Sequence, residues 1–350
     1  NFSACCPFHQ EKTPSFSVNP EKQFYYCFGC GAGGNAIGFV MDYERMEFRE
    51  AIESLAQAAG MELPAEEADA TPQIDHQKPL YESMEKATRL YESLLRKHPT
   101  RGRVVDYLKQ RGLSGEIARD FRLGFAPEGW DNLMNTLSSE EDIEHALTAG
   151  LLIENDSGRK YDRFRDRVIF PIVNQRGKVI AMGGRVLGDG KPKYLNSPET
   201  PLFSKSHELY GLHHIRKFAK NLSRIVVVEG YMDVIALAQF GIHYTVATLG
   251  TSVGKTHLEM LFRRVDQIVF CFDGDEAGRK AAFRGMEAAL PMMEDGRQVK
   301  FLFLPEGEDP DSLVRNKGSQ HLEHLFDNAD PLETFLFDQM AQGIDLDTMD

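Results

Sequence analysis

Acidic side chains follow three of the apolar runs between residues 225 and 311. Glu229 follows residues 225–228, Asp273 and Asp275 follow residues 268–272, and Asp309 and Asp311 follow residues 301–305, with Asp233 close behind Glu229. Carboxylates at the ends of buried strands are suited to holding hard divalent cations against phosphate groups. This pattern therefore predicts phosphoryl-transfer chemistry and indicates the part of the chain that performs it.

Each acidic segment also has a structural explanation. Asp273-Gly274-Asp275 is typical of a turn, Glu229-Gly230 of a strand end that needs a glycine, and Asp309-Pro310-Asp311 of a helix start. The coincidence of three such strand ends favours a metal site. Two divalent ions could activate a 3′-hydroxyl and stabilise leaving pyrophosphate, or Glu229 could act without metal as a general base. The sequence does not decide between these two mechanisms.

A second group of reactive side chains lies near the N-terminus, where four of the five cysteines occur in the first 30 residues. Cys6 and His9 form a C-x-x-H pair, Cys27 and Cys30 form a C-x-x-C pair, and seventeen residues separate the two pairs. Two ligand pairs on tight turns predict a closed tetrahedral site for one structural Zn²⁺. Cys5 could replace Cys6, but the C-x-x-H spacing favours Cys6.

Aromatic and lysine side chains surround the cysteine pairs: Phe16, Phe24, Tyr25, Tyr26, Phe28, Lys12 and Lys22. Exposed rings and cations of this kind stack on and neutralise single-stranded nucleic acid. The same rings could instead form the core of a small ribbon domain. The sequence favours neither alternative.

Charge is distributed unevenly along the chain, which carries a net −13. Residues 159–224 hold 15 Lys and Arg against 5 Asp and Glu, and this excess predicts a face that binds a polyanion. A solvated surface would mix the signs. In a strand, Arg163, Arg165 and Arg167 would share one face, and Gly183-Gly184-Arg185 would let backbone and guanidinium approach a phosphate. Lys193 and Lys205 complete the predicted groove.

The composition is that of a globular protein with two or three domains, at 350 residues, 42% hydrophobic and 27% charged. No uninterrupted apolar run is long enough for a transmembrane helix, and no signal segment opens the chain. The cysteine count excludes a disulfide framework and favours a reducing cytoplasm. The abrupt start at Asn1 and end at Asp350 suggest a fragment of a longer protein.

Periodicity divides the chain into segments of different character. A metal-binding segment with an amphipathic stretch reaches about residue 64, a polar and acidic linker covers 65–78, and residues 80–150 are mainly helical. Strands are expected at 168–173 and 179–186. Strands at 225–229, 244–249, 267–272 and 298–304 alternate with helices, which predicts a parallel sheet, and helices follow residue 311. The fold class is α/β within an α+β multidomain chain.

The motifs together resemble the bacterial replicative DNA primases of the DnaG type. The matching segments are the two cysteine pairs, residues 163–171 (RFRDRVIFP), Gly183-Gly184-Arg185, residues 192–197 (PKYLNS), residues 228–233 (VEGYMD), Asp273-Gly274-Asp275 and Asp309-Pro310-Asp311. They span nearly the whole chain in order. Residues 225–305 are similar to the Toprim fold that primases share with type IA and type II topoisomerases and some nucleases.

This resemblance implies a zinc ribbon at 1–64, a linker at 65–78, a basic subdomain at 79–222, a Toprim subdomain at 223–306 and a helical subdomain at 307–350. It implies catalytic and Mg²⁺- or Mn²⁺-binding roles for Glu229, Asp273, Asp275, Asp309 and Asp311. Template and nucleotide contacts are implied for Arg163, Arg165, Arg167, Arg185, Lys193 and Lys205.

The activity implied is synthesis of short RNA primers from NTPs on single-stranded DNA in the bacterial cytoplasm. The implied partners are the template, the primer–template hybrid, single-strand binding protein, and the replicative helicase through a C-terminal domain beyond this chain. Three alternatives remain: a Toprim topoisomerase, which needs a tyrosine nucleophile in a separate domain, a metal-dependent nuclease, and a non-catalytic single-strand binder.

Overall fold

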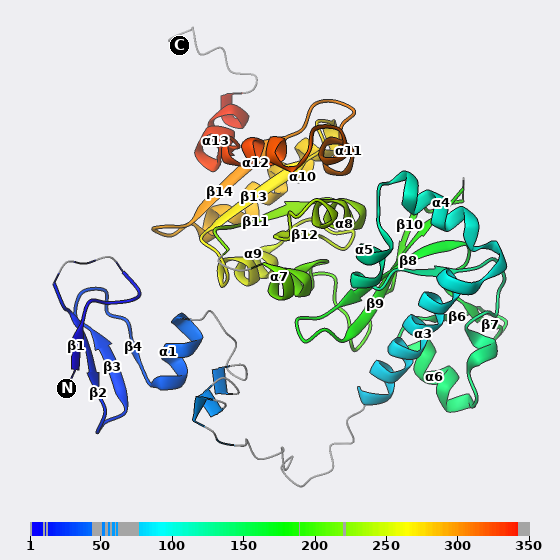
Figure 1. Ribbon diagram of the computed structural model, residues 1–350, viewed down its shortest axis with the longest axis horizontal. Coiled ribbons are helices and arrows are strands. Elements are labelled where there is room, and N and C mark those ends of the chain that lie inside the picture. Colours follow the sequence, from blue (N-terminus) through cyan, green and yellow to red (C-terminus); the bar gives the residue numbers. More distant parts are fainter. Residues whose placement is uncertain are drawn as a thin grey trace. The chain divides into compact units, whose positions relative to one another are not determined.

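The structure is a computed structural model that describes residues 2–9, 11, 13–43, 51–52, 55–56, 58–59, 61, 77–188, 190–219 and 222–341 (Figure 1). The chain divides into two compact units, Asn1–Ile74 and Asp75–Asp350, which are described separately. Most of the predicted linker at 65–78, part of the predicted amphipathic stretch and residues 342–350 lie outside the described residues. The predicted subdomain boundaries within the second unit stay predictions.

The first unit is an antiparallel ribbon followed by a helix. Its strands run in the order β1 (Phe2–Ala4), β2 (Phe16–Asn19), β3 (Phe24–Cys27) and β4 (Gly33–Gly34), and α1 (Ala36–Tyr43) follows. Strand β3 alternates in burial, because Tyr25 and Cys27 face the small core while Phe24 and Tyr26 face solvent. Tyr25 packs with Phe8, Phe16 and Phe39, so part of the aromatic set forms the core.

The second unit begins with helices that cover a four-stranded antiparallel sheet. The helices are α3 (Lys78–Lys97), α4 (Gly102–Gln110), α5 (Gly115–Asp120) and α6 (Glu140–Thr148), with short 3₁₀ turns at Pro99–Arg101 and Met134–Thr136. The sheet has the order β10 (Tyr194–Asn196), β9 (Val179–Val186), β8 (Arg167–Val173), β5 (Gly124–Ala126). A separate hairpin pairs β6 (Leu152–Glu154) with β7 (Lys160–Asp162).

The predictions for this region are confirmed for the two long strands, β8 and β9, and for the helices before them. Strands β5 and β10 and the β6–β7 hairpin were missed; each of these strands is only three residues long and gives little periodicity. The prediction that one strand carries Arg163, Arg165 and Arg167 on one face is wrong. Strand β7 ends at Asp162, β8 begins at Arg167, and Asp166 between them has a φ of 54° that interrupts an extended backbone.

A second sheet contains the acidic strand ends. Its order is β12 (Thr245–Ala247), β11 (Arg224–Val228), β13 (Gln267–Phe272), β14 (Gln298–Phe303), β15 (Asp330–Pro331), and the first four strands are parallel while β15 is antiparallel. Helices α8 (Tyr231–Gln239), α9 (Lys255–Phe262) and α10 (Glu276–Ala289) connect the strands in sequence, as the alternation predicts. A 3₁₀ turn at Leu290–Met292 follows α10.

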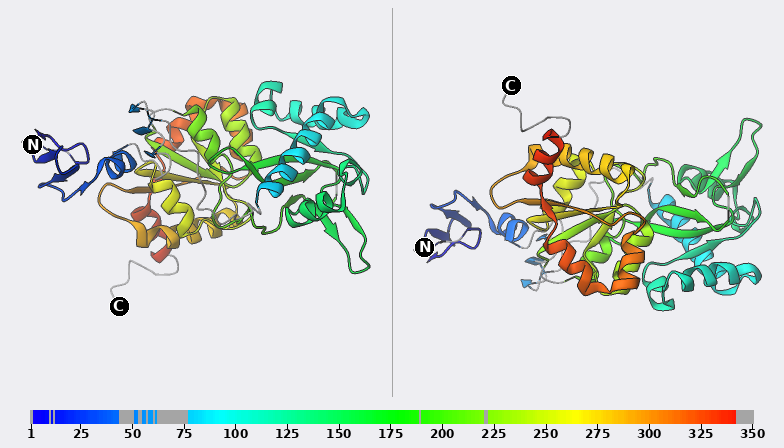
Figure 2. Two further views of the ribbon diagram at one scale, coloured as in Figure 1. Left: turned by 90° about the horizontal axis from the view of Figure 1, so that it is seen from below. Right: turned by 90° about the horizontal axis from the view of Figure 1, so that it is seen from above.

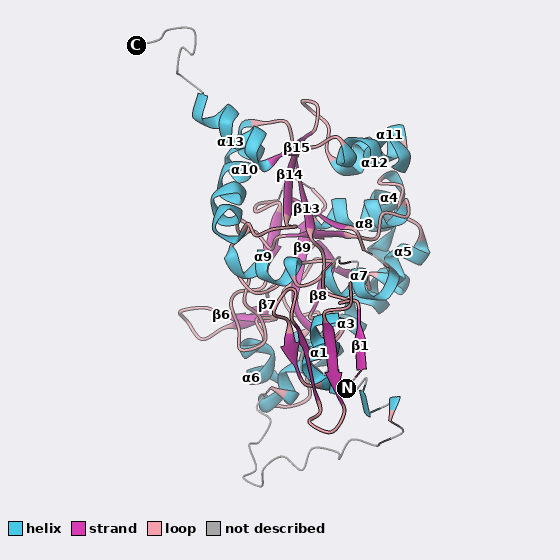
Figure 3. Ribbon diagram, turned by 90° about the vertical axis from the view of Figure 1, so that its left-hand side faces the viewer, coloured by secondary structure: helices cyan, strands magenta, loops and turns pink. Residues whose placement is uncertain are grey.

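Helices cover both faces of this second sheet (Figure 2). Helix α8 lies on one face with α11 (Pro310–Lys317) and α12 (Ser319–Asp327), whereas α9, α10 and α13 (Leu332–Ala341) lie on the other (Figure 3). The strand residues follow this division, because Val226 and Val228 pack with the first group and Ile225 and Val227 with the second. Helix α7 (Leu212–Phe218) packs with the second group.

One continuous apolar core joins the antiparallel sheet to the parallel sheet. Phe170 of β8 stacks on Tyr231 of α8 with ring centroids 5.6 Å apart, and both belong to the same buried cluster as Val226. The basic segment and the acidic strand ends are therefore held in one rigid arrangement. Among the described helices, none is both long and apolar enough to span a membrane.

Candidate active site and metal centre

Glu229 and the Asp273–Asp275 pair meet where the connections of the parallel sheet diverge. Strands β11 and β13 are parallel neighbours, but β11 leads into α8 on one face and β13 leads into α10 on the other. Such a divergence leaves a crevice beyond the carboxyl ends of the two strands, where α/β proteins bind ligands. The backbone N–H of Asp273 donates to Oε1 of Glu229 over 3.4 Å, so the two strand ends are in contact.

Close backbone packing fixes the loop that carries Asp273 and Asp275. A Cβ atom on Gly274 would lie 2.2 Å from the carbonyl oxygen of Leu304, and a Cβ on Gly278 would lie 2.2 Å from that of Asp273. Neither position can accept a side chain without moving the backbone. The loop is therefore a packed part of the sheet edge, which holds both carboxylates at defined positions.

Two of the acidic side chains also cap helices; the helix start at Asp309 was one of the structural explanations of the sequence, whereas the cap at Asp275 was not predicted. Asp275 Oδ1 accepts a hydrogen bond from the Gly278 N–H at 2.7 Å and begins α10. Asp309 Oδ1 accepts one from the Ser312 N–H at 2.6 Å and begins α11, with Pro310 at the first helical position. Each cap engages one carboxylate oxygen, and it fixes the rotamer of the side chain.

Burial and mutual repulsion raise the pKa values of three of the acids. Burial raises the pKa of Asp273 to about 6, and the charges of Glu229, Asp309 and Asp275 add to the effect. Burial, followed by the charge of Asp275, also raises the pKa of Glu229. The pKa of Asp233 is raised well above its usual value, first by burial and then by Asp309, Asp273 and Asp311. A cation placed among these carboxylates would relieve that repulsion.

Asp233 has a more central place than its sequence position indicated. It lies in the first turn of α8, where Oδ2 accepts a hydrogen bond from the Gly230 N–H at 3.0 Å. The charges that raise its pKa come from Asp273 and from the segment of Asp309 and Asp311, so Asp233 lies close to both acidic segments. Its spacing of four residues from Glu229 was the available sequence signal.

Asp311 differs from the other acids in its surroundings. Its side chain is completely buried, with Oδ2 2.5 Å from Nη1 of Arg111 and Oδ1 2.7 Å from Nε of Arg315. Both oxygens are therefore engaged by guanidinium groups. The prediction that Asp311 binds a metal ion stays a prediction, and its contacts give it a second role as the anion that anchors Arg111 and Arg315.

The acidic site and the cysteine site differ in compactness. Among the residues that the structure describes, the one group of three or more His, Cys, Asp or Glu side chains whose ligand atoms lie within 4.8 Å of one another is Cys6, His9, Cys27 and Cys30. Among the described residues, the carboxylates of the sheet edge do not form such a group. Mg²⁺ needs fewer protein ligands than Zn²⁺ in a closed site, because it keeps several waters and binds a few carboxylates together with substrate phosphates.

The cysteine site has the geometry of a tetrahedral zinc centre. Sγ of Cys6 lies 3.8 Å from Sγ of Cys30, and Sγ of Cys27 lies 3.8 Å from Nδ1 of His9. Zn–S bonds of about 2.3 Å in a tetrahedron place two sulfurs about 3.8 Å apart, so the sulfur–sulfur spacing fits one Zn²⁺. Gly29 is required here, because a Cβ at that position would lie 2.7 Å from Nε2 of His9. The resulting site is closed and structural.

Glu11 is a residue of this centre that the sequence analysis missed. Its carboxylate lies 3.3 Å from Nε2 of His9 and accepts hydrogen bonds from the N–H groups of Cys6 and Ser15 at 2.7 and 3.1 Å. A carboxylate behind a ligand histidine fixes the ring and its tautomer. No spacing rule identifies Glu11, because its role depends on the turn that brings it behind the ligands.

The aromatic residues of the ribbon divide between its core and its surface. Tyr25 and Phe16 are buried in the core, whereas Phe24, Tyr26 and Phe28 are exposed, Phe28 to 77%. Tyr26 and Phe28 contact each other edge to face with centroids 5.1 Å apart. The exposed rings give the ribbon a surface on which unpaired bases could stack.

The three arginines at 163–167 have separate surroundings. Arg163 donates through Nε to the carbonyl oxygen of Gly150 at 2.8 Å, and Arg165 lies over the Trp130 ring, 4.3 Å from its centroid. Arg167 is buried and donates to the carbonyl oxygens of Gly184 and Pro192 at 3.1 and 2.9 Å. Arg167 therefore holds the loop before Lys193 in place, and the three do not form one cationic face.

Arg185 projects from β9 between two aromatic rings. Its guanidinium lies 4.4 Å from the ring centroid of Tyr107 and 5.9 Å from that of Tyr194. The charges of Arg185, Arg111 and Asp311 all act on the pKa of Tyr107, so Arg185 and the Arg111–Asp311 ion pair lie around the same ring. Cation–π contacts of this kind hold a guanidinium without neutralising it.

The glycines before Arg185 serve packing, which corrects the expectation that they admit a phosphate. A Cβ on Gly183 would lie 2.5 Å from the Tyr231 ring, and a Cβ on Gly184 would lie 2.8 Å from the Phe164 ring. The Tyr231 hydroxyl donates to Oδ1 of Asn196 at 2.7 Å, and Asn196 donates to the carbonyl oxygen of Leu249 at 3.0 Å. These contacts join the basic sheet to the acidic sheet.

Backbone hydrogen bonds fix the positions of the two lysines of the predicted groove, Lys193 and Lys205. Lys193 is exposed, and its carbonyl oxygen accepts from the Val186 N–H and from Arg167. The Lys205 carbonyl oxygen lies 3.1 Å from Nε2 of His257, a fully buried histidine at the start of α9. The Lys205 N–H donates to Glu199 at 3.1 Å.

Comparison with known sequences follows the same division of the chain. Residues 1–71 match the CHC2 zinc finger, residues 90–216 match the N-terminal domain of the DNA primase catalytic core, and residues 226–314 match the Toprim-like family. The chain is 59% identical to a DNA primase of Pseudomonas putida, an alignment that covers 99% of this chain and 53% of the relative. The chain thus spans about half the length of the curated relatives it matches.

Solved structures agree in fold as well as in sequence. The DnaG primase catalytic domain bound to ssDNA aligns with a TM-score of 0.75 at 48% identity, over 79% of this chain and 89% of that one. The zinc-binding and RNA polymerase domains of the Aquifex aeolicus primase align with a TM-score of 0.68 at 34% identity, over 98% of this chain and 82% of that one. The chain therefore belongs to the DnaG-type family of bacterial DNA primases.

Proposed function

We propose that this chain synthesises short RNA primers from NTPs on single-stranded DNA. The observation that carries the proposal is the contact between the strand ends that bear Glu229 and Asp273, where the connections of β11 and β13 diverge. In such a reaction the primer 3′-oxygen bonds to the α-phosphorus of an incoming NTP, and the bond to pyrophosphate breaks. The attacking hydroxyl loses its proton, and negative charge develops on the attacking oxygen and on the leaving pyrophosphate.

Divalent cations are the expected cofactors at the acidic edge. Glu229, Asp273, Asp275 and Asp309 are proposed to hold Mg²⁺ or Mn²⁺, which would neutralise the phosphates and make the 3′-hydroxyl more acidic. Two roles are open to Glu229, since its raised pKa also suits a general base for that hydroxyl proton. Asp311 is proposed to position Arg111 and Arg315 beside the site, because both its oxygens contact them.

The basic residues are proposed to bind template and nucleotide. Arg185 and Lys193 are the main candidates, because Arg185 is held by aromatic rings without a carboxylate partner among the described residues and Lys193 is exposed. Arg163, Arg165 and Lys205 are proposed to contact the template at its periphery, and Arg167 to support the Lys193 loop. The ribbon is proposed to hold one Zn²⁺ and to engage unpaired bases through its exposed rings.

The wider partners are part of the same proposal. The product of the proposed reaction is a primer–template hybrid. The reaction needs single-stranded DNA, which appears at a replication fork. We therefore propose single-strand binding protein and, through a C-terminal domain, the replicative helicase as partners in the bacterial cytoplasm.

The direct test incubates the protein with single-stranded DNA, labelled NTPs and Mg²⁺, and resolves the products on a gel. Short labelled RNA is expected. Asp273→Ala should abolish synthesis and leave single-strand binding within about twofold, whereas Asp295→Ala, a matched change in an exposed loop, should alter neither. If the DNA is nicked or relaxed and no RNA forms, the proposal is wrong; loss of DNA binding in Asp273→Ala would make the acids structural.

The basic residues are tested by the salt dependence of DNA binding. Removal of a phosphate contact lowers the slope of log affinity against log salt by about one unit. Arg185→Ala is expected to lower it, and Arg165→Ala, at the periphery, to lower it less. An unchanged slope in Arg185→Ala would remove Arg185 from the nucleic-acid contact.

A further inference from the structure

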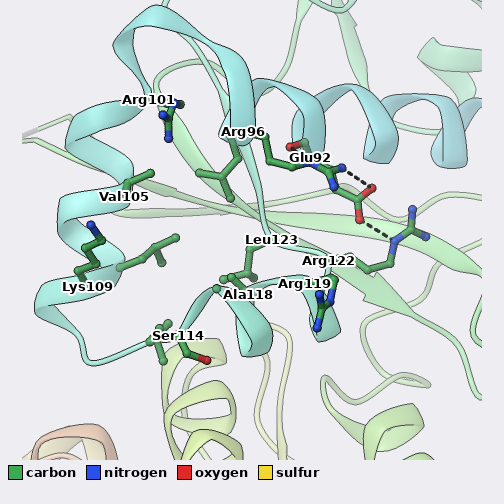
Figure 4. A pocket seen from close by; sticks show the side chains of 14 residues that line it. Glu92, Arg96, Arg101, Val105, Lys109, Ser114, Ala118, Arg119, Arg122 and Leu123 are labelled. Carbon is green, nitrogen blue, oxygen red and sulfur yellow. Dashed lines mark hydrogen bonds and ion pairs between the residues drawn. The ribbon is translucent and has the colours of Figure 1, made fainter.

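A pocket with an apolar floor and a cationic rim lies among α3, α4 and α5, apart from the acidic site (Figure 4). Its volume is about 320 Å³, at the lower end of the range of about 300–1,000 Å³ that ligand pockets occupy. The floor consists of aliphatic side chains, of which Leu108, Leu113 and Leu123 belong to the main core. The floor of the pocket is therefore part of the main hydrophobic core.

The rim carries far more positive than negative charge. Of the fourteen lining residues, five are cationic and one is acidic: Arg96, Arg101, Lys109, Arg119, Arg122 and Glu92. Arg122 is neutralised by Glu85 and Glu92 at 2.8 and 3.0 Å, and Glu92 is also the partner of Arg96. The single acid of the pocket is thus already engaged by two of the arginines.

The remaining rim cations are exposed and weakly compensated. Arg119 lies 3.9 Å from Glu116, but both side chains are more than 70% exposed, and such pairs contribute little. For Arg101 and Lys109 no acidic side chain lies within 4.0 Å among the described parts of the chain. In a chain of net charge −13, an uncompensated cationic rim around an apolar floor favours an anionic ligand with an apolar group.

The chemistry of the floor distinguishes the kinds of anion. None of the fourteen lining residues is aromatic, so the pocket offers no ring on which a nucleotide base could stack. The hydroxyl of Ser114 already accepts from the Ile117 N–H at 3.1 Å, where it begins α5. The floor therefore suits the apolar side chain of a peptide better than a base, and the rim suits flanking carboxylates.

We propose that this pocket is a docking site for an acidic segment of a partner protein, which inserts one large apolar side chain between α4 and α5 and places its carboxylates against Arg101, Lys109 and Arg119. Such interfaces commonly combine a buried apolar side chain with a charged rim. The apolar side chain contributes most of the affinity, and the charges contribute specificity.

Helix α4 separates this docking site from the acidic site. Val105, Leu108 and Lys109 face the pocket, whereas Tyr107 contacts Arg185, and Arg111, directly after α4, contacts Asp311. A bound segment would therefore occupy the outer face of α4 without covering the acids.

The test uses fluorescence anisotropy with the full chain and a labelled peptide in which one phenylalanine is flanked by aspartates. Binding is expected, and it should weaken at least tenfold when the phenylalanine is replaced by serine at unchanged charge. The double variant Arg101→Ala/Lys109→Ala should also weaken binding at least tenfold. The double variant Lys280→Ala/Arg284→Ala removes the same charges from the exposed face of α10 and should bind like the unaltered chain.

A second variant tests the floor. Val105→Asp places a carboxylate beside the anchor and should abolish binding, with circular dichroism and thermal unfolding reporting whether α4 remains folded. Three outcomes would overturn the proposal: equal binding of the serine peptide, equal losses in the two double variants, or competition by a short oligothymidylate that is itself lost in Arg101→Ala/Lys109→Ala. The last outcome would assign the pocket to nucleic acid.

Discussion

Arg111 and Asp311, two hundred positions apart in the sequence, form an ion pair in which Nη1 lies 2.5 Å from a carboxylate that solvent does not reach. The pair joins the turn after α4 to the first turn of α11. It therefore connects the basic part of the second unit with the helices that follow the parallel sheet, and it makes the position of α11 depend on α4.

Arg111→Ala is expected to destabilise the chain, because it leaves a buried carboxylate with one cationic partner in place of two. The loss in the free energy of unfolding should be about 3 kcal/mol, measured by urea denaturation. Arg103→Ala is the matched control on α4, since Arg103 pairs with Glu128 and Asp166 at the surface and should cost less than about 1 kcal/mol. Similar losses in both variants would contradict the anchoring role.

Asp311→Asn and Asp273→Asn should separate anchoring from metal binding. Asp273→Asn is expected to lower Mn²⁺ affinity at least tenfold with no loss of stability, because it removes one of several repelling carboxylates. Asp311→Asn should lower stability and keep Mn²⁺ affinity within about threefold. Isothermal titration with Mn²⁺, combined with thermal unfolding, measures both. Equal losses of affinity would make Asp311 a metal ligand.

The buried ring of His214 should lower the free energy of unfolding in mild acid. The ring stacks on Phe121 at 3.9 Å, its Nε2 lies 3.1 Å from the Asp120 carbonyl oxygen, and burial lowers its pKa to about 4. The unfolded chain binds a proton near pH 6.5 and the folded chain near pH 4, so stability falls as pH decreases through this window. The change should be on the order of 2 kcal/mol in urea denaturation between pH 7 and pH 4.

His214→Phe keeps the stacking surface and removes the titrating group. The difference in stability between this variant and the unaltered chain should therefore change with pH, in favour of the variant below about pH 6. A pH-independent difference would show that His214 titrates alike in the folded and unfolded states.

Glu11→Gln should weaken zinc binding, because Glu11 holds the His9 ring and the backbone of the Cys6 turn. Loss of such a supporting carboxylate lowers metal affinity about 10–100-fold. Competition with a chromophoric chelator measures the affinity. Glu21→Gln, in the exposed turn between β2 and β3, is the matched control and should leave it unchanged. An unaltered affinity in Glu11→Gln would reduce Glu11 to a turn residue.

The exposed rings of the ribbon should contribute to single-strand binding. Phe28→Ala and Tyr26→Ala are each expected to weaken binding of a short single-stranded oligonucleotide about tenfold, measured by anisotropy. Phe2→Ala is the control, because the strand pairings of Phe2 with Val18 and of Val18 with Tyr25 place Phe2 on the opposite side of the ribbon from Tyr26. Equal effects at Phe2 would argue against a defined stacking face.

The sequence predicted best where local pattern and chain order determine the structure. The apolar run at 267–272 became β13 with the same bounds, and its parallel pairing with β11 follows from the helices between them, so the meeting of Glu229 with Asp273 could be foreseen. The cysteine pairs were equally predictable, because their spacing alone fixes the ligand atoms.

Side-chain contacts between distant segments could not be foreseen. The alternation of Arg163, Arg165 and Arg167 suggested a strand, but the positive φ of Asp166 prevents one, and a single non-glycine residue gives no sign of this. The sequence suggested that Gly183 lets a phosphate approach the backbone, whereas in the structure the Tyr231 ring packs against this glycine. Glu11 and Arg111 likewise acquire their roles from turns and helices whose relative positions the sequence does not encode locally.

The short strand β15 has a consequence for self-association. A parallel sheet ends in unpaired backbone groups at its two lateral edges, which can recruit strands from other chains. Here Asp330 and Pro331 pair with Phe301 and Lys300 on one side, and Tyr210 bridges to Ala247 on the other. Proline offers no further donor, so the outer side of β15 is a poor template for another strand. The acidic carboxyl ends of the strands can thus stay exposed to ligands, while β15 on one lateral edge and the Tyr210–Ala247 bridge on the other reduce pairing with further chains.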